Sequence, residues 1–136
     1  KFNDKQIRSI IRITKFCLKK YKINKKNILG HSDIAPLRKM DPGEKFPWRF
    51  LYKKKIGIWH SINLKILKSL RGKKTEVNLH KFIIYLKHLG YHVEYSNFQE
   101  LRKIIKIFQM RFRPELTDGK LDLESYKIAK SLYNLR

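Results

Sequence analysis

Residues 30–48 constrain the fold more than any other segment, because prolines at positions 36, 42 and 47 interrupt the helical patterns on either side. Residues 31–46 are too rich in proline, glycine and charge to be regular, so we expect an ordered loop. The loop contains His31, Lys39 and Asp41. Imidazole and carboxylate bind zinc, and a catalytic zinc usually takes three protein ligands plus water. By spacing alone, a capped turn beside a structural histidine is the favoured interpretation, and zinc binding stays open.

The residues before the loop predict a helix and a short strand. Asn3 and Asp4 both suit an N-cap, and apolar residues then follow helical spacing as far as Tyr21. Cys17 is the single cysteine; we interpret it as a buried apolar filler on this helix, and it excludes an internal disulfide. Residues 28–30 form a short apolar run, which we interpret as a buried strand whose end delivers His31 to the loop.

Helical patterns continue after the loop. Pro47 suits the first turn of a helix with Trp48, Leu51 and Tyr52 on its inner face, and a short helix is possible over 64–70. A polar stretch at 71–74 predicts a boundary near residue 72. Three further helices are predicted over residues 77–89, 97–112 and 122–134. Together they would make a small three-helix bundle with a marginal core.

The chain is strongly basic, with 33 Lys and Arg residues against 11 Asp and Glu, a net charge of +22. Such an excess of positive charge is typical of proteins that bind nucleic acid or an anionic surface. However, lysines are scattered over nearly every segment, and the aromatic residues have core-type helical spacing. We therefore expect no nucleic acid partner and favour attraction to an anionic cell-envelope polymer. No apolar run approaches the roughly 18–20 residues that span a bilayer, so no transmembrane segment is expected in this chain.

The remaining histidines are weaker metal candidates. His88 and His92 are four residues apart, but Gly90 breaks the helix between them, so a facing pair on one helix is lost. His80 is isolated on a predicted helix. The loop therefore holds the best candidate ligands in the chain.

The loop closely resembles a known segment. Residues 30–48 read Gly-His-Ser-Asp-Ile-Ala-Pro-Leu-Arg-Lys-Met-Asp-Pro-Gly-Glu-Lys-Phe-Pro-Trp. They resemble the second metal-binding segment of the zinc-dependent N-acetylmuramoyl-L-alanine amidases of type 2, which cleave peptidoglycan between N-acetylmuramic acid and L-alanine. The resemblance implies that residues 1–72 are the C-terminal portion of the catalytic domain. This would be an incomplete α/β fragment of the mixed-sheet amidase fold, mostly helical as present.

The second half carries a weaker resemblance. Leu89-Gly90-Tyr91, Phe108-Gln109 and Asp118-Gly119 are spaced as in the peptidoglycan-binding domain that often follows such amidases. The resemblance implies that residues 73–136 form that helical domain. It also implies that peptidoglycan or muropeptides are the partners, while the oligomeric state stays open.

The resemblance assigns roles to the loop residues. It implies that His31 and Asp41 are ligands of a catalytic Zn²⁺ and that Lys39 is catalytic, stabilising negative charge on the tetrahedral intermediate. By their own side-chain chemistry, Ser32 and Asp33 can bond the loop backbone as in Asx-type turns, and Arg38 can pair with an acid. The family's third ligand, a histidine, and its general-base glutamate would lie upstream of Lys1. We therefore expect the C-terminal part of an amidase that does not hydrolyse peptidoglycan alone.

Two other functions stay open at this point. One is a non-catalytic peptidoglycan-binding protein derived from a decayed amidase, and the less favoured one is a basic nucleic-acid-binding protein. We expect a location in the cell envelope or periplasm, with the cytoplasm as the alternative.

Overall fold

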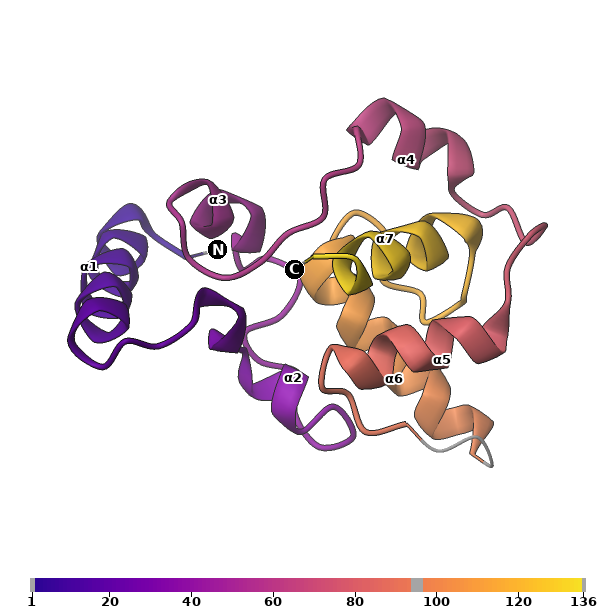
Figure 1. Cartoon of the computed structure of the whole chain (residues 1–136), viewed down its shortest axis with the longest axis horizontal. Helices are drawn as coiled ribbons and strands as arrows, with labels where there is room; N and C mark the ends of the chain where they lie inside the picture. The colour runs from indigo at the N-terminus through magenta and orange to yellow at the C-terminus, as the bar shows by residue number, and fades with distance from the viewer. Residues whose placement is uncertain (1, 94–96, 136) are drawn as a thin grey trace.

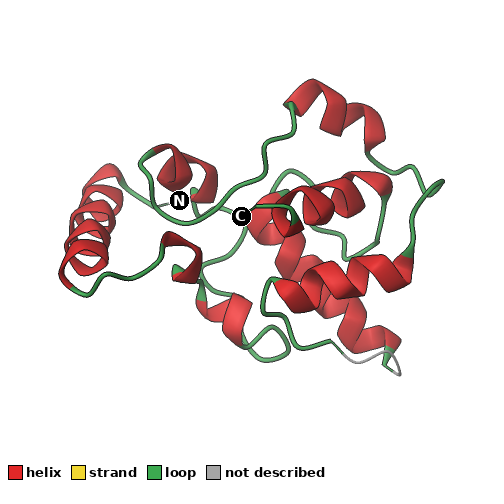
Figure 2. Ribbon diagram, in the orientation of Figure 1, coloured by secondary structure: helices red, strands yellow, loops and turns green. Residues whose placement is uncertain are grey.

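The computed structural model describes residues 2–93 and 97–135, and these residues form helices and loops without a β-strand (Figures 1 and 2). The expectation of a mostly helical chain is confirmed. The elements are α1 (Asp4–Lys20), the 3-10 helix η1 (Lys25–Asn27), α2 (His31–Ile34), α3 (Trp48–Lys53), α4 (Leu64–Leu70), α5 (Leu79–His88), α6 (Phe98–Phe112) and α7 (Leu123–Tyr133).

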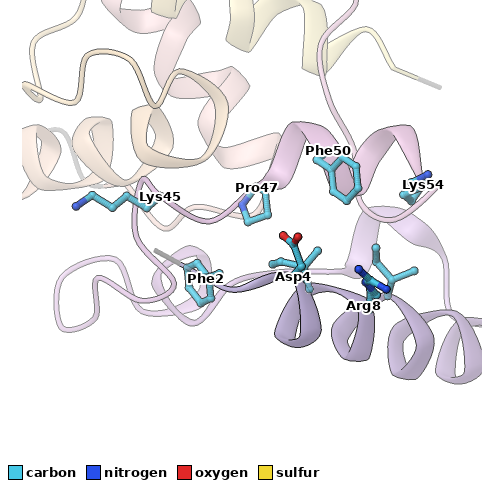
Figure 3. A pocket seen from close by; sticks show the side chains of 9 residues that line it. Phe2, Asp4, Arg8, Lys45, Pro47, Phe50 and Lys54 are labelled. Carbon is cyan, nitrogen blue, oxygen red and sulfur yellow. The ribbon is translucent and has the colours of Figure 1, made fainter.

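Helix α1 is amphipathic but lies at the edge of the molecule (Figure 1). The Asn3 side chain caps it by accepting from the Gln6 N–H, and the Gln6 side chain accepts from the Asn3 N–H in return. None of its residues is fully buried, and Cys17 is half-buried rather than buried as expected. A groove of about 590 Å³ separates α1 from α3; Figure 3 shows residues of both helices lining it.

The prediction of a strand over residues 28–30 is wrong. η1 ends at Asn27, the next three residues are irregular, and His31 opens α2. The Ile28 N–H closes the local turn onto the Lys25 carbonyl at 3.3 Å. The Ile28 carbonyl accepts from Arg111 at 2.9 Å, so a side chain takes the bond that a neighbouring strand would have made.

Helix α3 follows Pro47 as predicted, with a different inner face. Trp48 and Leu51 are buried in the core, whereas Tyr52 is exposed. Both α2 and α3 contact α6, so the segment around the loop is packed against the second half of the chain.

Helices α5, α6 and α7 lie together on the other side of the molecule, with α5 against α7 (Figure 1). Asparagine or aspartate caps each of them, at positions 78, 97 and 122. One buried apolar cluster includes Trp48 and Leu51 together with the inner faces of these three helices. The boundary near residue 72 stays a prediction, and buried apolar contacts extend across it.

The residues that carry the second resemblance are in contact. The Gln109 side chain is fully buried and accepts from the Gly119 N–H at 2.8 Å while donating to the Lys120 carbonyl at 2.8 Å. Gly119 also passes close to α6, since an added Cβ would lie 2.8 Å from the Arg102 carbonyl oxygen. Phe108-Gln109 and Asp118-Gly119 therefore belong to one α6–turn–α7 arrangement.

Candidate metal centre

Backbone hydrogen bonds fold the loop back on the start of α2. The Ser32 N–H donates to the Asp41 carbonyl at 2.9 Å, and the Lys39 N–H donates to the Ala35 carbonyl at 2.9 Å. The Asp33 carboxylate accepts from the Gly30 N–H at 2.7 Å, which ties the first turn of the short helix. Asp33 thus supports the loop backbone, as the sequence indicated.

Gly30 is required by close packing rather than by its backbone angles. An added Cβ would lie 2.8 Å from Cδ of Pro42 and 3.2 Å from the ring of Trp48. Real Cβ atoms essentially never come within 3.0 Å of such atoms. The two ends of the loop can therefore meet only if residue 30 has no side chain.

The fold brings the two candidate ligands together. Nδ1 of His31 lies 3.3 Å from Oδ2 of Asp41, with the two side chains 50% and 63% exposed. An imidazole and a carboxylate at this separation, open to solvent, suit two positions of a zinc site. Within residues 2–93 and 97–135, no group of three or more His, Cys, Asp or Glu side chains could hold a metal ion.

Lys39 lies on the same loop, exposed, two positions before Asp41. Its backbone is fixed by the bond to Ala35, and its side chain faces solvent on the loop that carries both candidate ligands. Its catalytic role stays a prediction.

A buried polar cluster lies behind the loop. Asp33 accepts from Nη1 of Arg111, and its other carboxylate oxygen accepts from the Tyr91 hydroxyl at 2.7 Å. Burial raises the pKa of Tyr91 well above its usual value, and the negative charge of Asp33 raises it further. Tyr91 is therefore a neutral donor, and Arg111 supplies the charge that offsets the Asp33 carboxylate.

Sequence reasoning missed both Arg111 and Tyr91 as partners of the loop. One signal was present: Arg111 stands between Met110 and Phe112, at the apolar end of α6, and is itself buried. A charged residue in a buried position normally requires a buried partner of opposite charge. The sequence does not indicate which acid supplies it.

Among residues 2–93 and 97–135, the other histidines form no metal-holding group with the loop pair. Helix α5 ends at His88, and Gly90 follows with φ of +95°, so His88 and His92 do not share a helical face. The His88 ring packs edge-on against Tyr133, 4.7 Å between centroids.

Residues 1–44 match the family model described as N-acetylmuramoyl-L-alanine amidase. Both His31 and Asp41 lie inside the match. In these residues the chain is similar to the type 2 N-acetylmuramoyl-L-alanine amidases, as its sequence indicated.

Among individual proteins, the chain is similar to the N-acetylmuramoyl-L-alanine amidase AmiD of Escherichia coli, with 36% identity over 133 residues. This alignment covers 96% of the chain and 48% of AmiD. A shorter match, 48% identical over 48 residues, relates it to the 1,6-anhydro-N-acetylmuramyl-L-alanine amidase AmpD of Haemophilus influenzae. It covers 35% of the chain and 26% of AmpD.

Solved structures show the same relationship. The structure of E. coli AmiD with the substrate anhydro-N-acetylmuramic acid-L-Ala-D-gamma-Glu-L-Lys superposes with a TM-score of 0.83 at 36% identity, covering 96% of this chain and 52% of that one. AmpDh3 of Pseudomonas aeruginosa gives 0.83 at 32% identity, with 96% and 53% covered. The fold is thus that of about half of these amidases, and the chain spans about half the length of AmiD.

Proposed function

We propose that this chain forms part of a zinc-dependent peptidoglycan amidase that hydrolyses the amide bond between N-acetylmuramic acid and L-alanine. The observation that carries the proposal is the 3.3 Å approach of His31 and Asp41 in the segment that matches the amidase family. The solved relatives AmiD and AmpDh3, whose structures were determined with anhydromuramoyl peptides, support this class of substrate.

The donor chemistry of the pair fits zinc. His31 and Asp41 would hold the ion, and when bound it would lower the pKa of a water molecule and polarise the scissile carbonyl. Lys39 would place a cation beside the oxygen that gains negative charge during attack. The hydrogen bond between Ser32 and Asp41 keeps the backbone on which both ligands stand in one arrangement.

Two ligands make only part of such a site. We propose that residues outside this sequence supply the third ligand and the general base, in line with the span of about half of AmiD. The 136-residue chain by itself is then expected to bind zinc weakly and to be inactive on peptidoglycan.

We propose further that residues 73–136 form a three-helix peptidoglycan-binding domain, built on the α6–turn–α7 arrangement held by Gln109. The net charge of +22 suits an anionic wall polymer, which favours the cell envelope as the place of action. No helix in the described part of the chain is long and apolar enough to cross a membrane.

A chimera tests the proposal: this chain replaces the matching half of E. coli AmiD and is given anhydro-N-acetylmuramic acid-L-Ala-D-gamma-Glu-L-Lys. We expect one equivalent of zinc and cleavage of the lactyl amide. His31→Ala and Asp41→Ala should lose metal and activity together, whereas Lys39→Ala should keep the metal and lose activity. His88→Gln, on α5, serves as the matched control and should change neither.

The alternative function, a non-catalytic wall binder, predicts a different result. Such a chimera would fold and be retained on insoluble cell wall in the presence of a chelator, yet would neither hold zinc nor cleave the substrate. That outcome would reject the proposed role of His31, Lys39 and Asp41.

A further inference from the structure

We propose that Arg111, on helix α6, is the positioning residue for the His31–Asp41 pair, so that the second half of the chain forms part of the scaffold of the metal site. The inference rests on the proposed function of that pair. It gives α6 a role in the amidase site in addition to any role in wall binding.

Arg111 contacts the loop on both sides of His31. Its Nη1 donates to the Asp33 carboxylate, and its Nη2 donates to the Ile28 carbonyl at 2.9 Å. Its guanidinium carbon lies 4.2 Å from the centroid of the Trp48 ring, within the range of a cation–π contact. One side chain therefore holds the approach to the loop, its first turn and its far end.

Through backbone hydrogen bonds, these contacts of Arg111 influence the positions of both candidate ligands. Asp33 uses the oxygen that Arg111 contacts to accept from the Gly30 N–H at 2.7 Å, which fixes the residue before His31. The Ser32 N–H, between His31 and Asp33, donates to the Asp41 carbonyl. The orientation of the first turn of α2 thus determines where both ligands stand.

Burial makes the cluster behind the loop rigid. Arg111 and Asp33 are 4% and 8% exposed, and the second Asp33 oxygen is taken by Tyr91. Loss of the guanidinium would leave a buried carboxylate without its counter-charge, and the loop would have to open to bring that carboxylate to water. Arg111 is too far from solvent to act as a substrate ligand, so its effect on the site is through position.

Arg113 provides a matched control. It is also buried, at 1% exposed, and lies two residues further along the chain. Its guanidinium pairs with Asp122 at 2.5 Å and Glu124 at 3.2 Å, at the start of α7, and with Asp118 at 3.4 Å. No hydrogen bond or ion pair joins it to the loop residues that the structure describes. Replacing either arginine should lower the stability of the whole chain, whereas only the replacement of Arg111 should loosen the loop that carries His31 and Asp41.

Amide hydrogen exchange of the metal-free chain, read residue by residue by NMR, separates these effects. In Arg111→Met we expect the amides of Ser32 and Asp33 to exchange at least tenfold faster than in the wild type, with those inside α7 changed less than threefold. Arg113→Met should give the opposite distribution. Tyr91→Phe, which removes one donor to Asp33, should accelerate the same loop amides and decides the matter if Arg111→Met does not fold.

Zinc affinity of the AmiD chimera, measured by competition with a chromophoric chelator, gives the second readout. We expect Arg111→Lys to bind zinc at least tenfold more weakly and Arg113→Lys to bind as the wild type does. Equal effects of the two arginines, or unchanged loop exchange, would overturn the inference. A wild-type chimera that holds no zinc would instead overturn the proposed function. The two failures can be told apart because the exchange experiment uses no metal and therefore tests the role of Arg111 independently.

Discussion

Oδ2 of Asp41 lies 3.3 Å from Nδ1 of His31, although nine residues, Pro36 among them, separate the two in the sequence. The approach depends on Gly30, whose missing side chain makes room for Pro42 and Trp48. It depends equally on the Ser32 N–H, which holds the Asp41 carbonyl. The pair is therefore a property of the folded loop.

Gly30→Ala should destabilise the chain and disorder the loop. The new Cβ would lie 2.8 Å from Cδ of Pro42, a ring atom that cannot swing away, so we expect a loss of about 1–3 kcal/mol in the free energy of unfolding. Urea denaturation measures it. Gly72→Ala is the comparison: φ is +74° but nothing lies within 4 Å, so its cost of about 1 kcal/mol should leave the loop amide shifts unchanged.

Stability should fall on acidification through the buried His60. Burial, reinforced by the charge of Arg49, lowers the pKa of His60 from 6.5 to about 4. The unfolded chain therefore takes up a proton at higher pH than the folded one, and this contribution is complete above pH 6.5 and lost as the pH falls toward 4. The loss should reach about 2–3 kcal/mol.

Thermal or urea unfolding between pH 7 and pH 4.5 tests this pH dependence. His60→Phe should show a flatter profile than the wild type over that range, whatever its stability at pH 7. His88→Gln, which changes an exposed histidine, should keep the wild-type slope. A profile for His60→Phe that parallels the wild type would show that another group titrates.

Glu124→Gln should be strongly destabilising. The Glu124 carboxylate is buried and accepts from Arg71 at 2.6 and 2.8 Å and from Arg113 at 3.2 Å. Removing its charge takes the carboxylate partner from Arg71 and one of three from Arg113, so we expect a loss of about 3–5 kcal/mol in chemical denaturation. Glu115→Gln, on the exposed surface of the same region, should change the free energy of unfolding by less than about 0.5 kcal/mol.

Gln109→Leu should loosen the turn between α6 and α7. It would leave the Gly119 N–H and the Lys120 carbonyl without their partner, at a cost of about 1–3 kcal/mol for each buried group. Differential scanning calorimetry should show a lower Tm, and amide exchange should accelerate first at Gly119. Gln99→Leu, at the exposed start of the same helix, should leave the Tm within a degree or two.

Local patterns predicted the helices well because their signals lie within a few residues. The structure has a helix where the apolar spacing before Tyr21 predicts one, and another directly after Pro47. Asn3 and Asp122 cap α1 and α7, as predicted. The strand predicted over residues 28–30 was wrong for the opposite reason. The sequence of a short apolar run does not indicate which group its backbone will pair with, and here the Ile28 carbonyl accepts from Arg111.

By itself, the sequence determined the similarity to the amidases, most of the helical segments and the loop in which His31, Lys39 and Asp41 stand. These follow from local spacing and from a contiguous motif. Only the tertiary structure decided that His31 and Asp41 meet, and that Arg111 and Tyr91, from the other half of the chain, hold Asp33 behind them. The physical reason is burial: a buried charge must find its partner in space, and periodicity along the chain does not encode which partner that is.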